Sequence, residues 1–333
     1  MRVLLIKMSS MGDILHTLPA VTDASRSMPD IKFDWVVEES FSEIPSWHRA
    51  VDQVIPVAMR RWRRQPLRHL FGREWRAFRT RLRATRYEAV IDAQGLIKSA
   101  VTSRLVSATR FGLDRQSARE GVAAWAYDHA IAVPKNMHAV ERLRELFALS
   151  LGYPVPHSYG TYAIDQLIRK QAAPSLPGLV FCHGSSRKEK LWPVRSWIAL
   201  AKLAAGSGLH VYLPWGDDNE QARAERIAAG SSNVTVLTRQ SLDELAVLLG
   251  NSMGVVAVDT GLGHLSAALS VPTVSLYGPT NPSMVGAYGQ YQVHIESPRS
   301  GAVGFDAKAL MHSIPAESVW RELQSVMHSA RTT

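Results

Sequence analysis

Short apolar runs recur along the whole chain and alternate with segments whose apolar residues have helical spacing. The runs predict strands at 3–6, 33–37, 51–58, 89–93, near Phe111, and at 179–182, 211–213, 234–237, 255–258 and 273–276. Uninterrupted apolar runs are typical of strands that are buried on both faces of a parallel sheet. Strand–helix alternation on this scale predicts an α/β protein whose parallel sheets are joined by right-handed crossovers.

The predicted helices and one break in the pattern define the domains. Proline and glycine cluster at 153–160, and the periodicity lapses there. Because 333 residues exceed the usual size of a single core, we predict domains at 1–158 and 159–312. Residues 313–333 are expected to form a final helix that packs back toward the first domain. Other helices are expected at 120–127, 138–149, after Pro193, and at 241–249 and 262–269.

Composition excludes several classes of protein. The single cysteine, Cys182, excludes an internal disulfide framework and suits a cytoplasmic protein. The apolar region at 255–277 contains Asp259 and His264, so it predicts strand, helix and strand and not a membrane span. The sequence has no paired-cysteine or His-x-x-x-His metal motif, no Walker loop and no Gly-x-Ser-x-Gly elbow. Neither a cofactor nor an obligatory metal is expected.

Positive charge is concentrated in one segment. The formal charge is +9, and residues 60–86 hold eleven arginines against the single acid Glu74, a local charge of +10. Phe71, Trp75, Phe78 and Leu82 keep helical spacing there, which predicts an amphipathic helix. Arginine pairs with carboxylates and phosphates. Nucleic acid, an anionic lipid and a merely solvated helix all remain open from this pattern.

The turn after the first strand carries a carboxylate, Asp13, at the start of a predicted helix. In open α/β sheets such turns lie at the carboxyl ends of strands, where ligands bind. The turn lacks the three glycines of a dinucleotide site, so no nicotinamide or flavin is expected. Asp13 is either a helix cap or a functional group, and its position alone does not decide between them.

Three turns of the second half could bind a phosphorylated ligand. At 258–264 a strand becomes a helix, and backbone N–H groups, glycines and the Thr260 hydroxyl make an anion site there. Ser185, Ser186 and Lys190 follow another strand and could hold a diphosphate. Glu220, after a third strand, could bind a ribose diol. The alternatives are a capped helix, a solvated loop and an exposed acidic helix start.

Taken together, these motifs resemble the heptosyltransferase family of lipopolysaccharide synthesis, glycosyltransferase family 9. The resemblance covers nearly the whole chain and is carried by residues 7–20, 33–39, 44–48, 60–63, 91–99, 259–265 and 277–282. It implies the GT-B architecture: two Rossmann-like, doubly wound domains that face each other across a cleft. The first domain would bind the acceptor and the second the donor.

The resemblance also implies a reaction. ADP-L-glycero-β-D-manno-heptose would be the donor and the inner Kdo of Kdo2-lipid A the acceptor, with inversion at the anomeric carbon. Asp13 would be the general base that takes the proton from the Kdo 5-hydroxyl. Because a helix start lowers the pKa of Asp13, proton transfer is expected late in the reaction. The implied donor-binding residues are Ser185, Ser186, Lys190, Glu220, Asp259, Thr260, Gly261, Leu262 and His264.

The arginine-rich segment then has an anionic acceptor to bind. The implied acceptor-binding residues are Ser10, Gly12, Arg60, Arg61, Arg63, Arg64, Lys98 and Arg119. Trp62 and the aromatic residues near Phe71 are expected to contact the bilayer, in a peripheral association with the cytoplasmic face of the inner membrane. Two alternatives stay open: a sister heptosyltransferase that acts on a heptosylated core, and a non-catalytic anion-binding protein. The second would use the arginines for nucleic acid, but no nucleic-acid module signature is present, so no nucleic-acid partner is expected.

Overall fold

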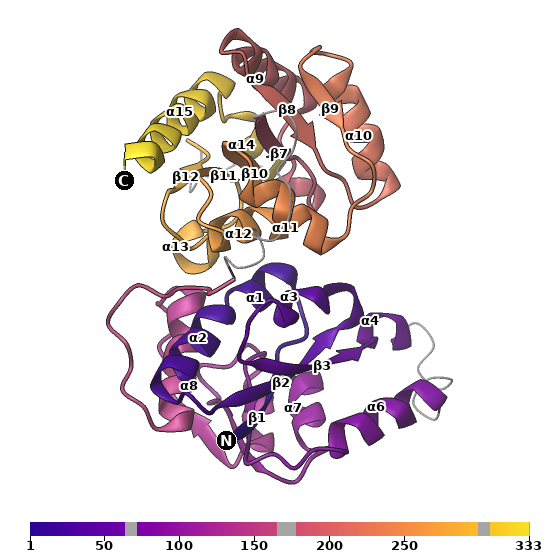
Figure 1. Cartoon of the computed structure of the whole chain (residues 1–333), viewed down its shortest axis with the longest axis vertical. Helices are drawn as coiled ribbons and strands as arrows, with labels where there is room; N and C mark the ends of the chain where they lie inside the picture. The colour runs from indigo at the N-terminus through magenta and orange to yellow at the C-terminus, as the bar shows by residue number, and fades with distance from the viewer. Residues whose placement is uncertain (64–71, 165–177, 299–306, 333) are drawn as a thin grey trace. The chain divides into compact units, whose positions relative to one another are not determined.

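The protein forms two compact units in a computed structural model, Met1–Ala163 and Ile164–Thr333. The structure describes residues 1–63, 72–164, 178–298 and 307–332. The division lies between Ala163 and Ile164, after the proline- and glycine-rich stretch at 153–160, whereas the sequence places the boundary between 158 and 159. Each unit contains one six-stranded parallel sheet with helices on both faces (Figure 1).

Both sheets have the strand order of a Rossmann fold. The first sheet contains, in spatial order, β3 (Val51–Val57), β2 (Lys32–Glu38), β1 (Arg2–Ile6), β4 (Ala89–Asp92), β5 (Thr109–Leu113) and β6 (His129–Ile131). The second contains β12 (Gln292–Glu296), β11 (Thr273–Tyr277), β10 (Gly254–Val258), β7 (Gly178–Cys182), β8 (His210–Leu213) and β9 (Val234–Val236). In each sheet the first strand of the domain lies at the centre, and the order reverses beside it.

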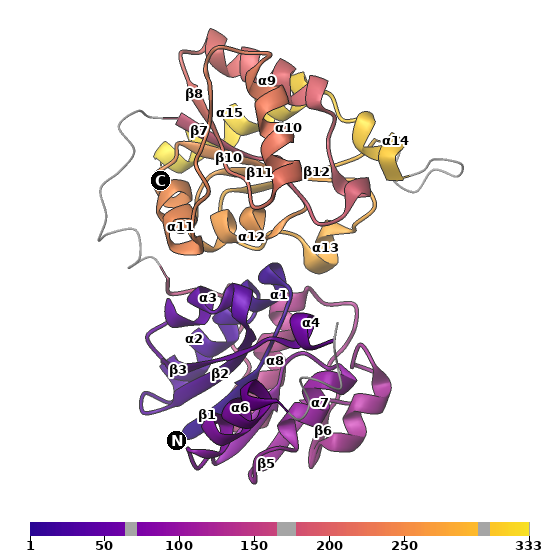
Figure 2. The same cartoon turned by 90° about the vertical axis from the view of Figure 1, so that its right-hand side faces the viewer.

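In the first domain, helices cover both faces of the sheet. One face carries α2 and α8, which pack together, and the other carries α6 and α7 (Figures 1 and 2). The helical elements are α1 (Met11–Leu15), α2 (Leu18–Ser27), η1 (Glu39–Phe41), α3 (Glu43–Ser46), α4 (Met59–Trp62), α6 (Arg73–Arg83), α7 (Ile97–Ser103), η2 (Gly121–Ala126) and α8 (Ala139–Leu151). The segment predicted as a helix at 120–127 is the 3₁₀ helix η2.

In the second domain the largest core lies between one sheet face and α9, α10 and α15. The helical elements are η4 (Lys188–Lys190), α9 (Val194–Gly206), α10 (Asp218–Ala228), α11 (Leu242–Gly250), α12 (Gly261–Ala268), α13 (Pro282–Val285), α14 (Ala307–His312) and α15 (Ala316–Thr332). The Trp192 indole N–H reaches into this core and donates to the Ile314 carbonyl at 3.1 Å.

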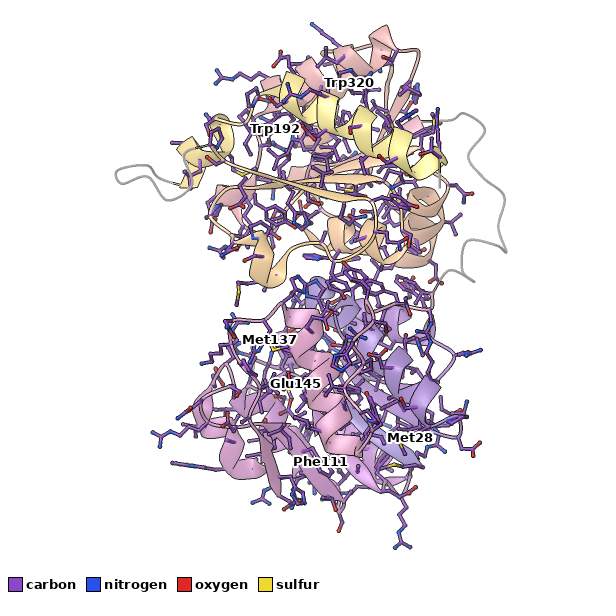
Figure 3. The ribbon with its side chains drawn as sticks, turned by 90° about the vertical axis from the view of Figure 1, so that its left-hand side faces the viewer. Met28, Phe111, Met137, Glu145, Trp192 and Trp320 are labelled. Atoms are coloured by element: carbon purple, nitrogen blue, oxygen red, sulfur yellow. The ribbon has the colours of Figure 1, made fainter. Side chains whose placement is uncertain are left out.

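The final helix, α15, packs on the second domain, so the prediction that it packs toward the first domain is wrong. Val319, Leu323 and Val326 are buried in the second core, and Trp320, also on α15, is partly buried against it (Figure 3). α15 meets α9 as α8 meets α2 in the first domain. The last helix of each domain therefore covers the sheet face on which the domain's first helices lie.

Local signals explain where several helices begin and end. Ser241 and Glu244 form a reciprocal capping box at the start of α11, and Asp217 caps α10 by accepting from the Glu220 N–H. Gly152 ends α8 with a φ of 78°, a left-handed conformation that favours glycine. The sequence does not predict the edge strands β6 and β12: two of the three β6 residues are exposed, and β12 alternates polar and apolar residues.

Candidate active site

The residues singled out from the sequence collect at the carboxyl ends of the central strands. The strand order reverses between β1 and β4 in the first sheet and between β7 and β10 in the second. Ligands of open α/β sheets bind at such reversal points, because the chain leaves the two strands in opposite directions and opens a crevice. The Asp13 turn follows β1, and the turns of Lys190 and Asp259 follow β7 and β10. Each domain therefore presents one half-site.

In the first half-site, Ser10 and Asp13 form a capping box at the start of α1. The Ser10 backbone N–H and hydroxyl both donate to one Asp13 oxygen, each at 2.8 Å. The neighbouring Gly12 is buried. The cap interpretation of Asp13 is thus correct as far as it goes, but only one of its two oxygens receives these hydrogen bonds. The other oxygen lies 4.0 Å from the Lys7 ammonium.

Lys7 and Gln94 hold this turn in place, and the sequence reasoning did not assign either of them to the site. The buried Lys7 ammonium donates to the Ala93 carbonyl at 2.8 Å. The Gln94 side-chain oxygen accepts from the N–H groups of Met8 and Ser9, and its amide donates to the Ser9 carbonyl. The available signal was that Gln94 follows β4, the strand that pairs with β1 in a Rossmann order.

The charge environment keeps Asp13 ionised. Burial by itself raises the pKa of the Asp13 carboxyl, but the Lys7 ammonium, the two Ser10 hydrogen bonds and the Arg119 charge outweigh it. The pKa of Asp13 therefore lies below its usual value, in the direction predicted. The pKa of Asp13 is lowered chiefly by the Lys7 charge and the two Ser10 hydrogen bonds.

The predicted acceptor-binding cations differ in how available they are. Arg60 lies over the Phe41 ring at 5.2 Å, and its N–H donates to the buried Glu38. The charges of Arg60 and Lys98 both act on Glu38, and that of Arg119 acts on Asp13 and Lys7. These three cations thus surround the first half-site.

Arg61 is engaged elsewhere. Its guanidinium bridges Glu39 and Glu74, with both Glu74 oxygens at 2.9 Å, so the segment's one acid neutralises it in part. Arg63 is exposed, and Arg64 lies outside the described residues.

The expectation that Trp62 contacts a bilayer is wrong. Trp62 is buried, packs edge-on against the rings of Trp75 and Phe78, and donates its indole N–H to Glu74 at 2.8 Å. The amphipathic helix is present as α6, whose Phe78 and Leu82 face the core. Phe71 lies outside the described residues. The described aromatic residues of this segment therefore stabilise the first domain from within.

In the second half-site, the turns after β7 and β10 are joined by side chains. The Lys190 ammonium lies 2.5 Å from one Asp259 oxygen, and the Ser185 hydroxyl donates to the Asp259 carbonyl at 3.2 Å. His264 Nε2 lies 3.9 Å from the other Asp259 oxygen. Asp259 is thus placed between two basic side chains, and its charge is offset where a phosphate would bind. Ser186 is exposed on the same turn.

Helix α12 begins directly beside this ion pair. Thr260 is its N-cap residue and makes no side-chain capping bond, while Gly261 and Leu262 form the first turn and are half-buried. The orphan N–H groups of a helix start are donors for an anion. The structure therefore brings the predicted Ser185, Lys190, Thr260 and Gly261 to one edge of the second sheet.

Glu220 reaches the same edge from α10. One of its oxygens accepts from the Gly216 N–H at 2.8 Å, and burial raises the pKa of its carboxyl. Gly184 gives Glu220 its space, because a Cβ at this position would come within 2.2 Å of a Glu220 oxygen. Gly184 lies directly before Ser185, so Glu220 borders the turn after β7.

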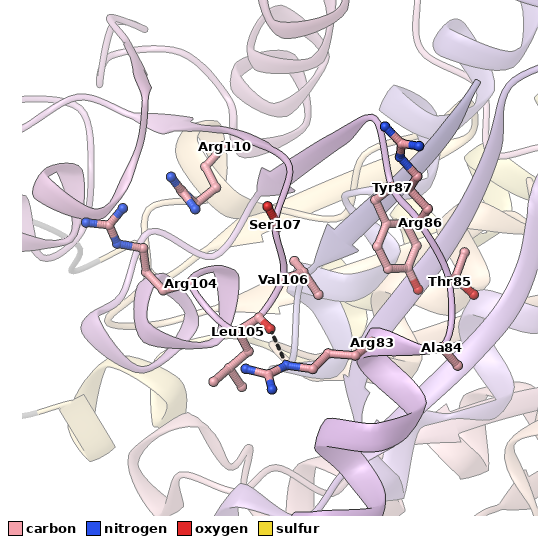
Figure 4. A pocket seen from close by; sticks show the side chains of 10 residues that line it. All are labelled: Arg83, Ala84, Thr85, Arg86, Tyr87, Arg104, Leu105, Val106, Ser107 and Arg110. Carbon is pink, nitrogen blue, oxygen red and sulfur yellow. Dashed lines mark hydrogen bonds between the residues drawn. The ribbon is translucent and has the colours of Figure 1, made fainter.

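A second basic surface lies at the opposite edge of the first sheet. A hollow of about 700 Å³ is lined by Arg83, Arg86, Arg104 and Arg110 in segments that precede or begin β4 and β5 (Figure 4). The Arg83 guanidinium donates to the Leu105 carbonyl, and Arg110 pairs with Asp128. Parallel strands end at the other edge, so this hollow is separate from Asp13. Among the described residues no group of three or more His, Cys, Asp or Glu is arranged to hold a metal.

Known proteins resemble this chain in sequence and in fold. Residues 75–313 match the sequence model of glycosyltransferase family 9 (heptosyltransferase). Lipopolysaccharide heptosyltransferase 1 of Pseudomonas aeruginosa is 54% identical over 298 residues, which are 89% of this chain and 84% of that protein.

Two solved structures are similar throughout. E. coli heptosyltransferase WaaC with ADP has a TM-score of 0.91 and 46% identity, covering 98% of this chain and 100% of that one. The same protein with ADP-2-deoxy-2-fluoro heptose has a TM-score of 0.88 and 46% identity, covering 98% and 99%. The two Rossmann-like domains are thus of the GT-B type that the sequence predicts. The chain belongs to glycosyltransferase family 9, the heptosyltransferases.

Proposed function

We propose that this enzyme transfers L-glycero-D-manno-heptose from ADP-heptose to the 5-hydroxyl of the inner Kdo of Kdo2-lipid A, in the synthesis of the lipopolysaccharide inner core. The observation that carries the proposal is the near-full-length similarity to a heptosyltransferase solved with an ADP-heptose analogue. The 54% identity to a lipopolysaccharide heptosyltransferase 1 favours this acceptor over a heptosylated core.

Asp13 is the proposed general base. Inverting transfer needs a group that removes the acceptor proton as the oxygen attacks the anomeric carbon. Asp13 has a carboxylate oxygen outside the Ser10 cap and is ionised well below neutral pH. A low pKa makes it a weak base for a ground-state hydroxyl. Proton transfer therefore takes place late, when the attacking hydroxyl has become acidic.

The second half-site is the proposed donor site. Lys190, with Ser185 and Ser186, stabilises the diphosphate of the departing ADP, and the α12 N–H groups at Gly261 and the Thr260 hydroxyl add donors. Glu220 binds the ribose hydroxyls and Asp259 the heptose hydroxyls. Leu262 and His264 border the same turn. These roles use each group's chemistry: cations and N–H groups on phosphate, and carboxylates on hydroxyls.

The first half-site is the proposed acceptor site. Ser10, Gly12, Arg60, Lys98 and Arg119 follow strands of the first sheet at the same edge as Asp13, and they offer donors that suit the Kdo carboxylates and lipid A phosphates. Arg61, Arg63 and Arg64 extend this positive surface. Since the acceptor is a lipid, the enzyme works as a peripheral protein on the cytoplasmic face of the inner membrane. No described helix is long and apolar enough to span a bilayer.

An assay of ADP release tests the proposal. The enzyme is incubated with ADP-heptose and either Kdo2-lipid A or the heptosylated acceptor, and Asp13→Asn serves as the inactive comparison. We expect ADP formation with Kdo2-lipid A and little with the heptosylated acceptor. Absence of ADP formation, or full activity in a folded Asp13→Ala variant, contradicts the proposal. A preference for the heptosylated acceptor assigns the sister reaction.

A further inference from the structure

Four large apolar side chains are exposed together on the first domain. Ile97 and Val101 lie one turn apart on α7 and are 49% and 56% exposed, and Val122 and Trp125 lie three residues apart on η2 and are 54% and 74% exposed. Residues three apart in a 3₁₀ helix point to the same side, as do residues four apart in an α-helix. Since α7 and η2 pack side by side, we call this surface the α7–η2 face.

Small residues hold the two elements together beneath the face. Ala100, Ala123 and Ala124, with Tyr127, form a buried cluster between α7 and η2. The Glu120 carboxylate accepts from the Ile97 N–H at 2.7 Å and fixes the start of α7 to the segment before η2. The arrangement is therefore rigid, and it turns the largest apolar side chains outward. Soluble proteins rarely expose several large apolar side chains on two adjoining elements without a partner for them.

Cations surround the face. Lys98 lies beside Ile97, Arg104 ends α7, and Arg115 and Arg119 precede η2, the three arginines being exposed. The acids of this region are engaged, since Glu120 accepts from Ile97 and Asp114 accepts from the Ser117 N–H. An apolar centre that includes a tryptophan, with a rim of Lys and Arg, matches the interface of an anionic bilayer.

The face adjoins the first half-site. The Glu120 N–H donates to the Gly95 carbonyl at 3.0 Å, and Gly95 follows Gln94, which holds the Asp13 turn. Arg119, whose charge acts on Asp13, directly precedes Glu120. A lipid surface in contact with the face would therefore present its headgroups beside Arg119, whose charge acts on Asp13.

We propose that the α7–η2 face is the surface by which this enzyme docks on an anionic phospholipid bilayer. The four apolar side chains insert among the lipids while the surrounding cations contact the phosphates. This inference rests on the proposed function for its biological role, because a lipid acceptor requires such contact. The docking itself is independent of catalysis and is measured without substrate.

Vesicle flotation tests the docking. The full chain is mixed with vesicles of phosphatidylcholine or of phosphatidylethanolamine with phosphatidylglycerol. We expect binding to the anionic vesicles that weakens as salt is raised. Val101→Glu/Trp125→Glu should lower the partition coefficient at least tenfold. Leu149→Glu, at a residue of α8 that is 49% exposed, is the matched control and should bind as the wild type does.

Activity separates docking from catalysis. Val101→Glu/Trp125→Glu should keep wild-type turnover on a deacylated, water-soluble acceptor and lose it on an acceptor in vesicles. If no acceptor is turned over by the wild type, the proposed function fails while the vesicle result stands.

Three results would overturn the docking proposal: no binding of the wild type to anionic vesicles, retained binding in Val101→Glu/Trp125→Glu, or equal loss in Leu149→Glu. Vesicle binding could also persist in Val101→Glu/Trp125→Glu and be lost in Arg83→Gln/Arg86→Gln. The bilayer would then contact the arginine hollow, and the α7–η2 face would be left for a protein partner.

Discussion

The Lys190 ammonium and the Asp259 carboxylate form an ion pair of 2.5 Å that joins the turns after β7 and β10. Both side chains are largely buried, with 14% and 10% of their surfaces exposed. The pair places a cation beside the start of α12 before any ligand arrives. A donor diphosphate would compete with Asp259 for the Lys190 ammonium. Substitutions of Lys190 and of Asp259 should therefore change the affinity for ADP differently.

Lys190→Met should weaken ADP binding and lower kcat by about 10²–10³-fold, because it removes a preorganised cation from the leaving group. Calorimetric titration with ADP and the ADP-release assay measure both effects. Lys188→Met changes an exposed lysine of the same 3₁₀ turn and is the control. If Lys190→Met and Lys188→Met lose ADP affinity and kcat equally, Lys190 acts only through the net positive charge of the turn and not through a direct contact with the diphosphate.

Asp259→Asn should keep or strengthen ADP binding while it lowers turnover of ADP-heptose. Removing the carboxylate removes repulsion of the phosphates, but it also removes the proposed acceptor of the heptose hydroxyl hydrogen bonds. The same titration, repeated with ADP and with ADP-heptose, distinguishes the two effects. A drop in ADP affinity as large as that of Lys190→Met would assign Asp259 to positioning Lys190 and not to sugar binding.

The pH dependence of the reaction should follow Asp13 and its neighbour Lys7. The base must be ionised, so kcat/KM falls as pH drops through the Asp13 pKa, which lies below the usual value. Lys7→Met removes the cation that lowers the pKa of Asp13, and burial then raises this pKa. The fall of kcat/KM on the acidic side (the acidic limb) should therefore move to higher pH. Ser10→Ala, which removes the hydroxyl donor, should move the limb less in the same direction.

Asp13→Asn should lower kcat by about 10²–10⁴-fold, and its kcat/KM should no longer fall at acidic pH through the titration of residue 13. If kcat/KM falls at the same acidic pH in the wild type and in Lys7→Met, Asp13 is not the titrating base.

Gly184→Ala should displace the Glu220 side chain without unfolding the domain. The new Cβ meets the far end of a side chain, which can rotate away. If Glu220 binds the ribose, losing this charge-assisted hydrogen bond should weaken ADP binding about tenfold or more. Gly206→Ala, whose Cβ meets no atom within 4 Å, is the control for the thermal midpoint and for ADP affinity. Unchanged ADP affinity in Gly184→Ala would remove Glu220 from the donor site.

The buried ion pair between Asp23 on α2 and Arg144 on α8 should carry much of the first domain's stability. Arg144 Nε lies 2.6 Å from the Asp23 carboxylate, and both side chains are at most 4% exposed. Asp23→Ala removes a carboxylate from a buried guanidinium that also pairs with Glu141, and it should cost about 3–5 kcal/mol in unfolding free energy. The double variant Asp23→Ala/Arg144→Met should cost less than the sum of the single changes, as urea unfolding would measure.

Much of the fold could be predicted because it depends on local order along the chain. The runs 255–258 and 273–276 match β10 and β11 to within a residue, since a strand buried on both faces consists mainly of apolar and small residues. The short edge strands β6 and β12 are not predicted, because two of the three β6 residues are exposed and β12 alternates polar and apolar residues. The sequence predicts a helix at the position of η2 but does not predict that it is a 3₁₀ helix, because its 3₁₀ winding depends on packing against α7.

The chain by itself determined the strand–helix alternation and the positions of the polar turns around Asp13, Lys190 and Asp259 that follow the central strands. Only the tertiary structure decided the partner of each apolar face. The periodicity of α15 shows that one of its faces is buried but not which sheet buries it, and the aromatic spacing around Trp62 fits a core as well as a bilayer.

The same limit applies to the site. The partnership of Lys7 and Gln94 with the Asp13 turn comes from the pairing of β1 with β4, strands separated by more than eighty residues of sequence. Sequence patterns record the periodicity and polarity of a segment, whereas burial and pKa depend on which distant segments the parallel strand order brings beside it.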